Sequence, residues 1–311
     1  MKKINFILIL IFLAFTAFGA PVDTVKKVQD AVVNITTTVG SAPASGAYDP
    51  YSKFKDMALE GLGAGFVVRS DGIIVTCYHV IERASSAKVS FSDGAVYDAF
   101  PIGWDKSLDI AVLKINPQRP LQTVSFGNSD FIASGETAII IGNPTGFENS
   151  VLIGNIAHPK RYFHTNKGFG AYIQLAALMN HGNSGGPVFN EDGEVIGMAA
   201  SSYTMDNAVG IGLAIPSNVL RRVVPYLSAN QSLKKGNPGF TLRDDMTISG
   251  VATEGSAIGL KVGDKLISMD GIRMADPLAY DYILRTLPAG SETSAVFRRA
   301  GSELKVVLKV R

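Results

Sequence analysis

Short apolar or alternating runs, separated by turn residues, make up most of the chain from Ala31 onward. Examples are residues 32–37, 65–68, 73–76 and 110–115. Asp-Gly pairs at residues 71–72, 93–94 and 192–193 lie between such runs, and this dipeptide is a strong signal for a β-hairpin turn. The pattern predicts many strands and little helix, which is typical of an all-β barrel or sandwich domain.

The pattern changes near residue 217. We expect a helix over residues 218–227 with Ser217 as its N-cap, followed by a polar linker rich in Gly, Lys and Asn. The rest predicts a smaller unit with strands near 247–251, 265–269, 294–298 and 304–310. A helix there begins at Pro277 after Asp276. The predicted boundaries are 22–228 for the first domain, 229–237 for the linker and 238–311 for the second domain.

The first nineteen residues have the pattern of a secretory signal peptide. Lys2 and Lys3 precede an apolar run over residues 7–15, and Ala17 and Gly19 offer small residues before a cleavage point. The segment is at the short limit for spanning a bilayer, so a retained membrane anchor is the alternative. We expect a protein that works outside the cytoplasm, in the periplasm or an equivalent compartment.

Composition narrows the class of protein. The 311 residues are 46% hydrophobic and 18% charged, which excludes a disordered chain. The 29 basic residues barely exceed the 27 acidic ones, and Lys2 and Lys3 account for the excess, so charge gives no argument for nucleic-acid binding. The single cysteine, Cys77, excludes an intramolecular disulfide and a Cys-built zinc site, and we expect it to be a buried packing residue.

The strongest chemical signal is Gly-Asn-Ser-Gly-Gly-Pro at residues 182–187. A serine nucleophile needs a tight turn that exposes its hydroxyl and directs backbone N–H groups at an oxyanion, and flanking glycines permit both. A plain Gly-rich turn is the alternative. Two other segments favour the nucleophile, because His79 ends an apolar strand and Asp109 begins another. The order His, Asp, Ser is that of chymotrypsin-type barrels.

With these segments in place, the chain resembles the HtrA/Deg proteases, which are chymotrypsin-fold serine proteases followed by PDZ domains. Further agreement comes from residues 61–66, 125–129, 141–144 and 210–216. The resemblance implies a mainly β chain with a chymotrypsin-like double β-barrel protease domain and a small α+β PDZ domain. It covers nearly all residues from Val22 to the C-terminus.

The resemblance implies a role for each residue of the site. Ser184 would be the nucleophile, His79 the general base, and Asp109 the group that orients the imidazole. The N–H groups of Gly182 and Ser184 would form the oxyanion hole. Asp105 is a rival for the acid, with a solvated turn residue as its alternative reading.

Specificity and control depend on further positions. Leu178, Met179, Ala199 and Ala200 predict an apolar pocket for small or medium aliphatic P1 side chains, with plain core packing as the alternative. Arg161 aligns with a loop arginine that carries a regulatory signal in relatives, although it could equally be a solvated surface residue.

The second unit resembles a PDZ domain through residues 254–257, 259–264 and 267–271. Such domains bind C-terminal peptides by adding a strand at a sheet edge. The predicted carboxylate-binding loop holds Gly239, Phe240, Thr241 and Leu242, and a helix carrying Tyr280, Ile283 and Leu284 would line the groove. A purely structural cap is the alternative.

We therefore expect an ATP-independent serine endoprotease of protein quality control and stress response that needs no cofactor or metal. It would cleave unfolded, misfolded or exposed polypeptide and be regulated by its PDZ domain. The alternatives are a chaperone or peptide-binding scaffold, or a membrane-anchored protease with one client. Relatives are generally trimers. Tyr48, Tyr51 and Phe54, in a predicted loop over residues 40–60, would pack within that loop or against another subunit.

Overall fold

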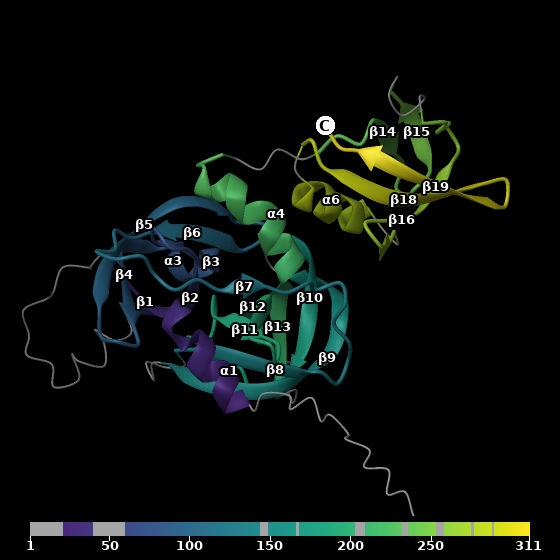
Figure 1. The fold of residues 1–311 in the computed structure, drawn as a ribbon. Helices are drawn as coiled ribbons and strands as arrows, with labels where there is room; N and C mark the ends of the chain where they lie inside the picture. Colours follow the sequence, from purple (N-terminus) through teal and green to yellow (C-terminus); the bar gives the residue numbers. More distant parts are fainter. Residues whose placement is uncertain are drawn as a thin grey trace, which may run out of the picture.

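A computed structural model describes residues 21–39, 60–143, 149–165, 168–202, 209–231, 236–252, 258–274, 277–287 and 289–311. These residues form a large β-rich part and a smaller C-terminal part, which lies beyond helix α4 (Figure 1). The predicted signal peptide and the Tyr48, Tyr51 and Phe54 loop lie outside the described residues. No helix in the described ranges is long and apolar enough to cross a membrane.

The first barrel is a closed sheet of six strands in the order β1-β2-β3-β6-β5-β4. The strands are β1 (Val32–Val39), β2 (Glu60–Arg69), β3 (Ile73–Cys77), β4 (Ala84–Phe91), β5 (Val96–Asp105) and β6 (Ile110–Lys114). The Asp-Gly pairs at 71–72 and 93–94 join β2 to β3 and β4 to β5, as predicted, and both glycines have positive φ.

The second barrel closes in the same way. Its strands are β7 (Ser125–Phe126), β8 (Thr137–Gly142), β9 (Ser150–Thr165), β10 (Gly168–Ala176), β11 (Pro187–Phe189), β12 (Glu194–Ser202) and β13 (Ile211–Pro216). They follow the order β11-β8-β9-β10-β13-β12-β7, and an additional β11–β12 pairing completes a ring. The short β7 adds to β12 in parallel. The predicted double β-barrel is confirmed.

In the part of the chain that the structure describes, three α-helices and a 3-10 helix accompany the barrels. Helix α1 (Pro21–Val28) and the 3-10 helix η1 (Gln29–Ala31) precede β1, α3 (Tyr78–Ile81) follows β3, and α4 (Ser217–Ser228) follows β13. The sequence pattern missed α1, whose Thr24 hydroxyl donates to the Glu191 carbonyl of the second barrel at 2.7 Å. The prediction of Ser217 as an N-cap was wrong, because Ser217 lies inside α4 and its hydroxyl donates to the Gly127 carbonyl at 2.9 Å.

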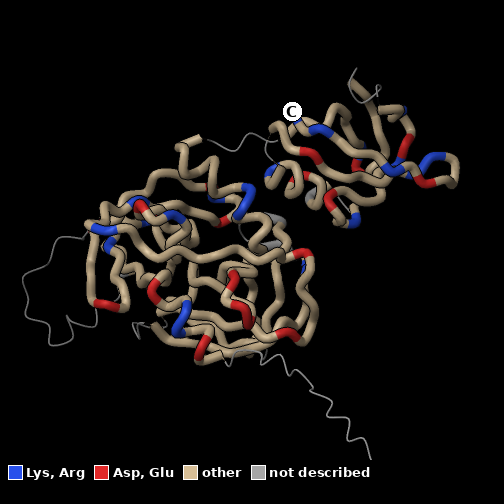
Figure 2. The backbone as a smooth tube through the Cα atoms, viewed as in Figure 1, with Lys and Arg blue, Asp and Glu red and all other residues tan. Residues whose placement is uncertain are grey.

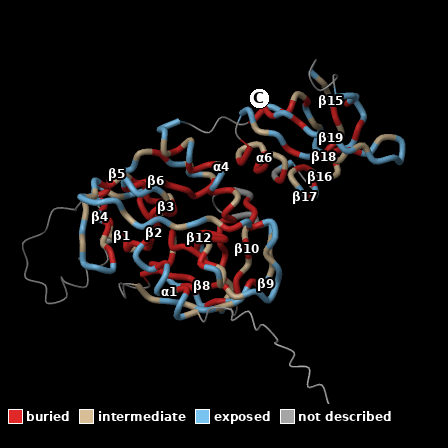
Figure 3. Tube along the Cα trace, viewed as in Figure 1, coloured by how far each residue is buried: buried red, intermediate tan, exposed pale blue. Residues whose placement is uncertain are grey.

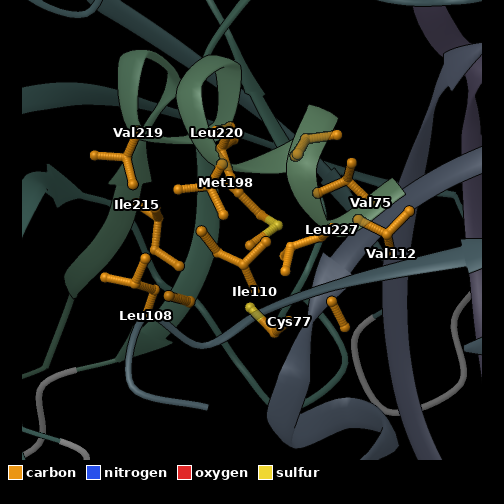
Figure 4. Close-up of a cluster of buried hydrophobic side chains, with 14 of the residues drawn as sticks. Val75, Cys77, Leu108, Ile110, Val112, Met198, Ile215, Val219, Leu220 and Leu227 are labelled. Atoms are coloured by element: carbon orange, nitrogen blue, oxygen red, sulfur yellow. The ribbon is translucent and has the colours of Figure 1, made fainter. Parts of the chain in front are cut away.

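The core lies within the barrels and beneath α4, which contacts both of them. Strands β3, β8 and β11 are buried along nearly their whole length, whereas β4 alternates between buried and more exposed positions (Figure 3). Figure 4 shows Leu220 and Leu227 of α4 in one apolar cluster with Ile110, Cys77 and Met198. Because the apolar side chains of α4 are buried against strands of both barrels, the helix joins the two barrels.

Among its described residues, the C-terminal unit contains a two-stranded and a four-stranded sheet and one helix. The elements are β14 (Phe240–Leu242), β15 (Ile248–Val251), β16 (Lys265–Met269), β17 (Ile272–Arg273), α6 (Pro277–Thr286), β18 (Glu292–Arg299) and β19 (Ser302–Lys309). The larger sheet has the order β17-β16-β18-β19. The predicted strands and the helix starting at Pro277 are confirmed.

Helix α6 also contacts the second barrel. Tyr282 is buried and hydrogen-bonds with the backbone of Ala171 in β10. Arg222 of α4 donates to both carboxylate oxygens of Asp270, at 2.6 and 3.1 Å. Basic and acidic side chains are otherwise interspersed over both parts of the chain (Figure 2). Where the structure describes them, the two parts therefore contact each other through one defined ion pair and one buried tyrosine, and not through two surfaces of opposite charge.

Candidate active site

His79 is held at the point where β3 ends and the short helix α3 begins. Its ring Nδ1 lies 2.8 Å from Asp109 Oδ2. Its backbone N–H donates to the other carboxylate oxygen, Oδ1, at 3.0 Å. Since one carboxylate binds both the ring and the main chain of His79, the orientation of the imidazole is fixed.

Asp109 occupies the last position of the turn before β6. It is 4% exposed and has a φ of +57°, in the left-handed region that aspartate tolerates better than most residues. The Tyr78 N–H donates to the Asp109 carbonyl at 3.1 Å. The backbone strain is therefore offset by hydrogen bonds that join the turn to α3.

Asp105, the rival acid, has a different role. Its Oδ1 accepts hydrogen bonds from the Ser107 N–H and hydroxyl, at 2.8 and 2.6 Å, and from the Leu108 N–H at 2.9 Å. These contacts are those of a turn-forming carboxylate. The structure therefore pairs His79 with Asp109, and Asp105 builds the turn that carries Asp109.

Ser184 lies in a tight turn packed between the barrels. The Ala64 N–H of β2 donates to the Ser184 carbonyl at 2.9 Å, and the Gly185 N–H donates to the Ala199 carbonyl at 2.7 Å. Gly185 has a φ of +86°, and a Cβ there would lie 2.2 Å from the Ala64 oxygen and 3.0 Å from the Cys77 nitrogen. Only glycine allows this approach, which brings the serine turn against the end of β3, two residues before His79.

The Ser184 hydroxyl donates to the Ala200 carbonyl at 3.5 Å in this structure. The N–H groups of Gly182 and Ser184 have no acceptor among the described residues. The Gly182 carbonyl accepts from the Asn143 N–H at 3.1 Å, which holds this peptide unit against the end of β8. Two free amides beside a serine hydroxyl can stabilise a negatively charged oxygen on an adjacent carbon.

Comparison with known proteins gives the family. Residues 63–198 match a trypsin-like peptidase domain. A probable periplasmic serine endoprotease DegP-like of Pseudomonas fulva is 33% identical over 269 residues, covering 80% of this chain and 56% of that protein. The solved structure of the HtrA-type protease AlgW with tripeptide has a TM-score of 0.66 at 25% identity, covering 94% of this chain and 96% of that chain. The chain belongs to the HtrA/Deg family.

A DegP-like protein of Rickettsia conorii is 29% identical over 329 residues, covering 93% of this chain but 65% of that protein. The chain thus spans less than two thirds of the length of these two relatives. Membership of the family explains the double barrel. The activity of this chain depends on the geometry of its own site.

Buried asparagines behind the nucleophile turn are a feature that the sequence analysis did not anticipate. Asn183 is 0% exposed and Asn143 1% exposed. Within the described residues, both polar side-chain atoms of Asn183 and the Oδ1 of Asn143 have no hydrogen-bond partner. A Cβ on Gly142 would lie 2.7 Å from Asn183 Oδ1, so little space is left beside that amide.

The predicted specificity pocket is only partly enclosed. Ala199 and Ala200 are buried on β12, and Met179 is buried close to Gly212 in the core of the second barrel. Leu178, in contrast, is 60% exposed. Its side chain is therefore directed to solvent rather than into a closed pocket, because its neighbour Met179 fills the inner position. The aliphatic preference stays a prediction.

Arg161 lies on β9 opposite Tyr172 of β10, and its Nε donates to Gln174 Oε1 at 3.0 Å. It is exposed. Since the adjacent β9–β10 pair, Tyr162 with Ala171, includes the residue that Tyr282 contacts, Arg161 is close to the junction between the two parts of the chain.

The predicted carboxylate-binding loop is well ordered by contacts of its own. Gly239 has a φ of +83°, and its carbonyl accepts from the Ala252 N–H at 2.8 Å. Phe240 is buried and its ring stacks on Tyr280 of α6, with 6.1 Å between the centroids. The Thr241 and Ser249 hydroxyls are 3.0 Å apart, and Leu242 pairs with Ile248. Phe240 therefore packs against α6, and the peptide-binding role of the loop stays a prediction.

Proposed function

We propose that this chain is a serine endopeptidase that cleaves polypeptides through Ser184, His79 and Asp109. The observation that carries the proposal is the bond between His79 Nδ1 and Asp109, at 2.8 Å, next to the Ser184 turn. The family supports it, since curated relatives are named serine endoproteases.

The reaction would begin with rotation of the Ser184 hydroxyl from the Ala200 carbonyl toward His79. Catalytic hydrogen bonds are often long or absent in a free enzyme and tighten when substrate binds. His79 Nε2 then takes the serine proton while the oxygen attacks the scissile carbonyl, and it later returns that proton to the leaving amine. Asp109 stabilises the imidazolium, and water hydrolyses the acyl-enzyme in a second round.

The amides of Gly182 and Ser184 would stabilise the tetrahedral oxyanion. Removing one such donor costs about 3 kcal/mol of transition-state stabilisation in related chemistry. Gly182 has a φ of +99°, and the Asn143 N–H donates to its carbonyl, so this bond would help to hold the turn in place for substrate. We propose that this arrangement of the turn sets the resting activity.

The substrates we propose are unfolded or misfolded polypeptides outside the cytoplasm, after cleavage of a signal over residues 1–19. Curated relatives named periplasmic support the location. A retained segment would instead anchor the protein to the inner membrane. We further propose the domain boundaries 22–228 and 238–311 with a linker over 229–237, and a homotrimer as the assembly.

We propose that the C-terminal unit is a PDZ domain that regulates the peptidase. A C-terminal peptide would add as a strand along the edge that includes Phe240 and place its carboxylate at the Gly239 loop. Tyr280 of α6 stacks on Phe240, while Tyr282 of the same helix contacts β10. A shift of α6 on binding peptide would therefore reach the strand pair that carries Arg161.

Degradation of an unfolded model protein such as casein tests the activity. We expect Ser184→Ala to abolish cleavage, while Ser85→Ala, on an exposed position of β4, leaves it unchanged. Equal cleavage by Ser184→Ala and wild type would refute the proposal. If wild type were inert but suppressed aggregation of a denatured client, the chaperone alternative would stand. Adding hydrophobic C-terminal peptides then tests the PDZ domain, since we expect the cleavage rate to change.

A further inference from the structure

Cys77 is the one cysteine of the chain, and the proposed mechanism does not use it. It is the last residue of β3, is 0% exposed, and its thiol donates to the Ala199 carbonyl at 3.4 Å. Figure 4 shows it at the edge of the apolar cluster, near Leu108 and Ile110. It therefore lies between the core and the His79–Asp109 pair.

The three side chains are close enough to share an ion. One possible ligand atom from each of Cys77, His79 and Asp109 lies within 4.8 Å of the other two. In a tetrahedral zinc site, with bonds of about 2.0–2.3 Å, neighbouring ligand atoms are about 3.3–3.8 Å apart. Side-chain movements of about 1 Å would bring the ligand atoms from up to 4.8 Å to the separation found in a zinc site, without moving the strands.

The donor set is chemically suited to a thiophilic cation. Thiolate sulfur, imidazole nitrogen and carboxylate oxygen are the three protein ligands that Zn²⁺ prefers, and three of them leave a fourth position for water or a carbonyl. The His79 side chain is 31% exposed and that of Asp109 is 6% exposed, so an ion would enter from the His79 side.

We propose that Cys77, His79 and Asp109 form a binding site for Zn²⁺ or a similar thiophilic divalent cation, and that occupancy inhibits the peptidase. Binding of the ion is independent of the proposed function, whereas the inhibition rests on it. The site differs from a structural zinc site, because the ion would compete with the hydrogen bond that holds the imidazole.

The chemistry of occupancy explains the inhibition. The Cys77 thiol loses its proton to solvent and the thiolate bonds to the metal. The His79 Nδ1 lone pair bonds to the metal, so the neutral ring carries its hydrogen on Nε2. An Nε2 that already bears hydrogen cannot accept the proton of Ser184, so the nucleophile is not activated. When a chelator removes the ion, the Cys77 thiolate takes a proton back from solvent and the His79 hydrogen returns from Nε2 to Nδ1, which restores the original tautomer.

Binding is tested on Ser184→Ala protein, which retains the three ligands. Cd²⁺ alone is added, and its thiolate charge-transfer absorbance is recorded in the ultraviolet. Since the chain has one cysteine, any such band must come from Cys77. We expect a saturating band at one equivalent that disappears in Ser184→Ala/Cys77→Ala protein and is removed by EDTA.

Inhibition is tested with Zn²⁺ on proteins that keep Ser184, each compared with its own metal-free rate. We expect Zn²⁺ to lower the cleavage rate of wild type by at least about tenfold. Cys77→Ala should need at least about tenfold more Zn²⁺ for the same decrease in rate. Cys77→Ser, which keeps the volume but is a poorer ligand, serves as the second variant if alanine disturbs the core.

Each outcome has one meaning. A Cd²⁺ band without any proteolysis by the metal-free wild type would support the metal site and refute the proposed function. Absence of a band at millimolar Cd²⁺, with a folded protein by circular dichroism, would refute the site. Equal Zn²⁺ inhibition of wild type and both Cys77 variants would also refute it, because the ion would then act elsewhere.

Discussion

At the scale of single residues, neighbouring carboxylates have unlike roles because their hydrogen-bond partners differ. Asp109 binds His79 twice, whereas Asp105 binds only the backbone and hydroxyl of its own turn. The two residues also differ in burial, since Asp109 is 4% exposed whereas Asp105 is half-buried. The difference can be tested directly, because each can be converted to the isosteric amide.

Asp109→Asn is expected to lower kcat by about 10⁴-fold, because the amide favours the wrong tautomer of His79. Asp105→Asn is the matched control. Its Oδ1 can still accept the hydrogen bonds of the turn, so we expect less than about a tenfold change. Steady-state cleavage of a peptide substrate checks both. A larger loss in Asp105→Asn than in Asp109→Asn would reverse the assignment.

A second residue-scale prediction concerns Gly185. Gly185→Ala should lower activity by more than about 100-fold, because the new Cβ would collide with the Ala64 carbonyl and displace the Ser184 turn. Gly94→Ala is the control, since Gly94 has a similar φ of +83° but nothing within 4 Å of the added carbon. It should cost about 1–2 kcal/mol of stability and leave the activity intact. Equal activities would show that the turn tolerates displacement.

At the scale of elements, one ion pair ties β18 to the loop before β16. Arg299 of β18 donates to both oxygens of Asp264, at 2.6 and 2.7 Å. Asp264 also accepts from the Lys261 N–H at 2.8 Å. The hydrogen bonds from Arg299, together with that N–H, lower the pKa of Asp264 below its ordinary value. The pair therefore contributes stability that depends on pH.

Because the folded-state pKa of Asp264 is lowered, its contribution is complete above the unfolded value of about 3.9 and is lost as pH falls through the folded value. Arg299→Ala should therefore destabilise the C-terminal unit relative to wild type near pH 7, with little difference between the two proteins in strong acid. Hydrogen exchange of β16 and β18 across pH measures this. Arg298→Ala, whose Glu303 partner is 4.0 Å away and exposed, should change stability by less than about 0.5 kcal/mol. If the stability difference between Arg299→Ala and wild type were the same in acid as at pH 7, the Asp264–Arg299 pair would not be its cause.

At the scale of the whole molecule, two contacts join the C-terminal unit to the barrels. Arg222 and Asp270 form a bidentate pair, with side chains 31% and 23% exposed. Tyr282 is buried against β10, and burial raises the pKa of its hydroxyl, which stays protonated. These contacts hold the C-terminal unit against α4 and β10.

Arg222→Ala should loosen this docking, because it leaves Asp270 without its main partner across the junction. We expect a larger radius of gyration in small-angle X-ray scattering and faster proteolytic cleavage in the linker over 229–237. Arg285→Ala is the control, because its partner Asp281 lies one turn away on the same helix, at 2.7 Å. If both variants behaved alike, the ion pair would not hold the two parts together.

Local patterns alone were sufficient to predict most elements, whereas the candidate site was predicted from the His, Asp and Ser segments together with the family resemblance. Alternating runs and Asp-Gly pairs predicted the strands, because a strand buried on one face repeats every two residues and a hairpin turn needs a positive φ. The His, Asp and Ser segments predicted a triad because each carries its own local signature. Helix α1 was missed, since its burial depends on Glu191 and neighbouring residues far along the chain.

The sequence by itself predicted the strands and the second unit, and through the family resemblance it predicted the double barrel and favoured Asp109 over Asp105 as the partner of His79. Only the tertiary structure showed the different hydrogen bonds of the two carboxylates, turned Leu178 to solvent and put Arg222 beside Asp270. It also brought Cys77 within reach of two further metal ligands. The physical reason is that strand and turn signals act over a few residues, whereas burial, partner choice and side-chain direction depend on segments that meet only when the barrels close.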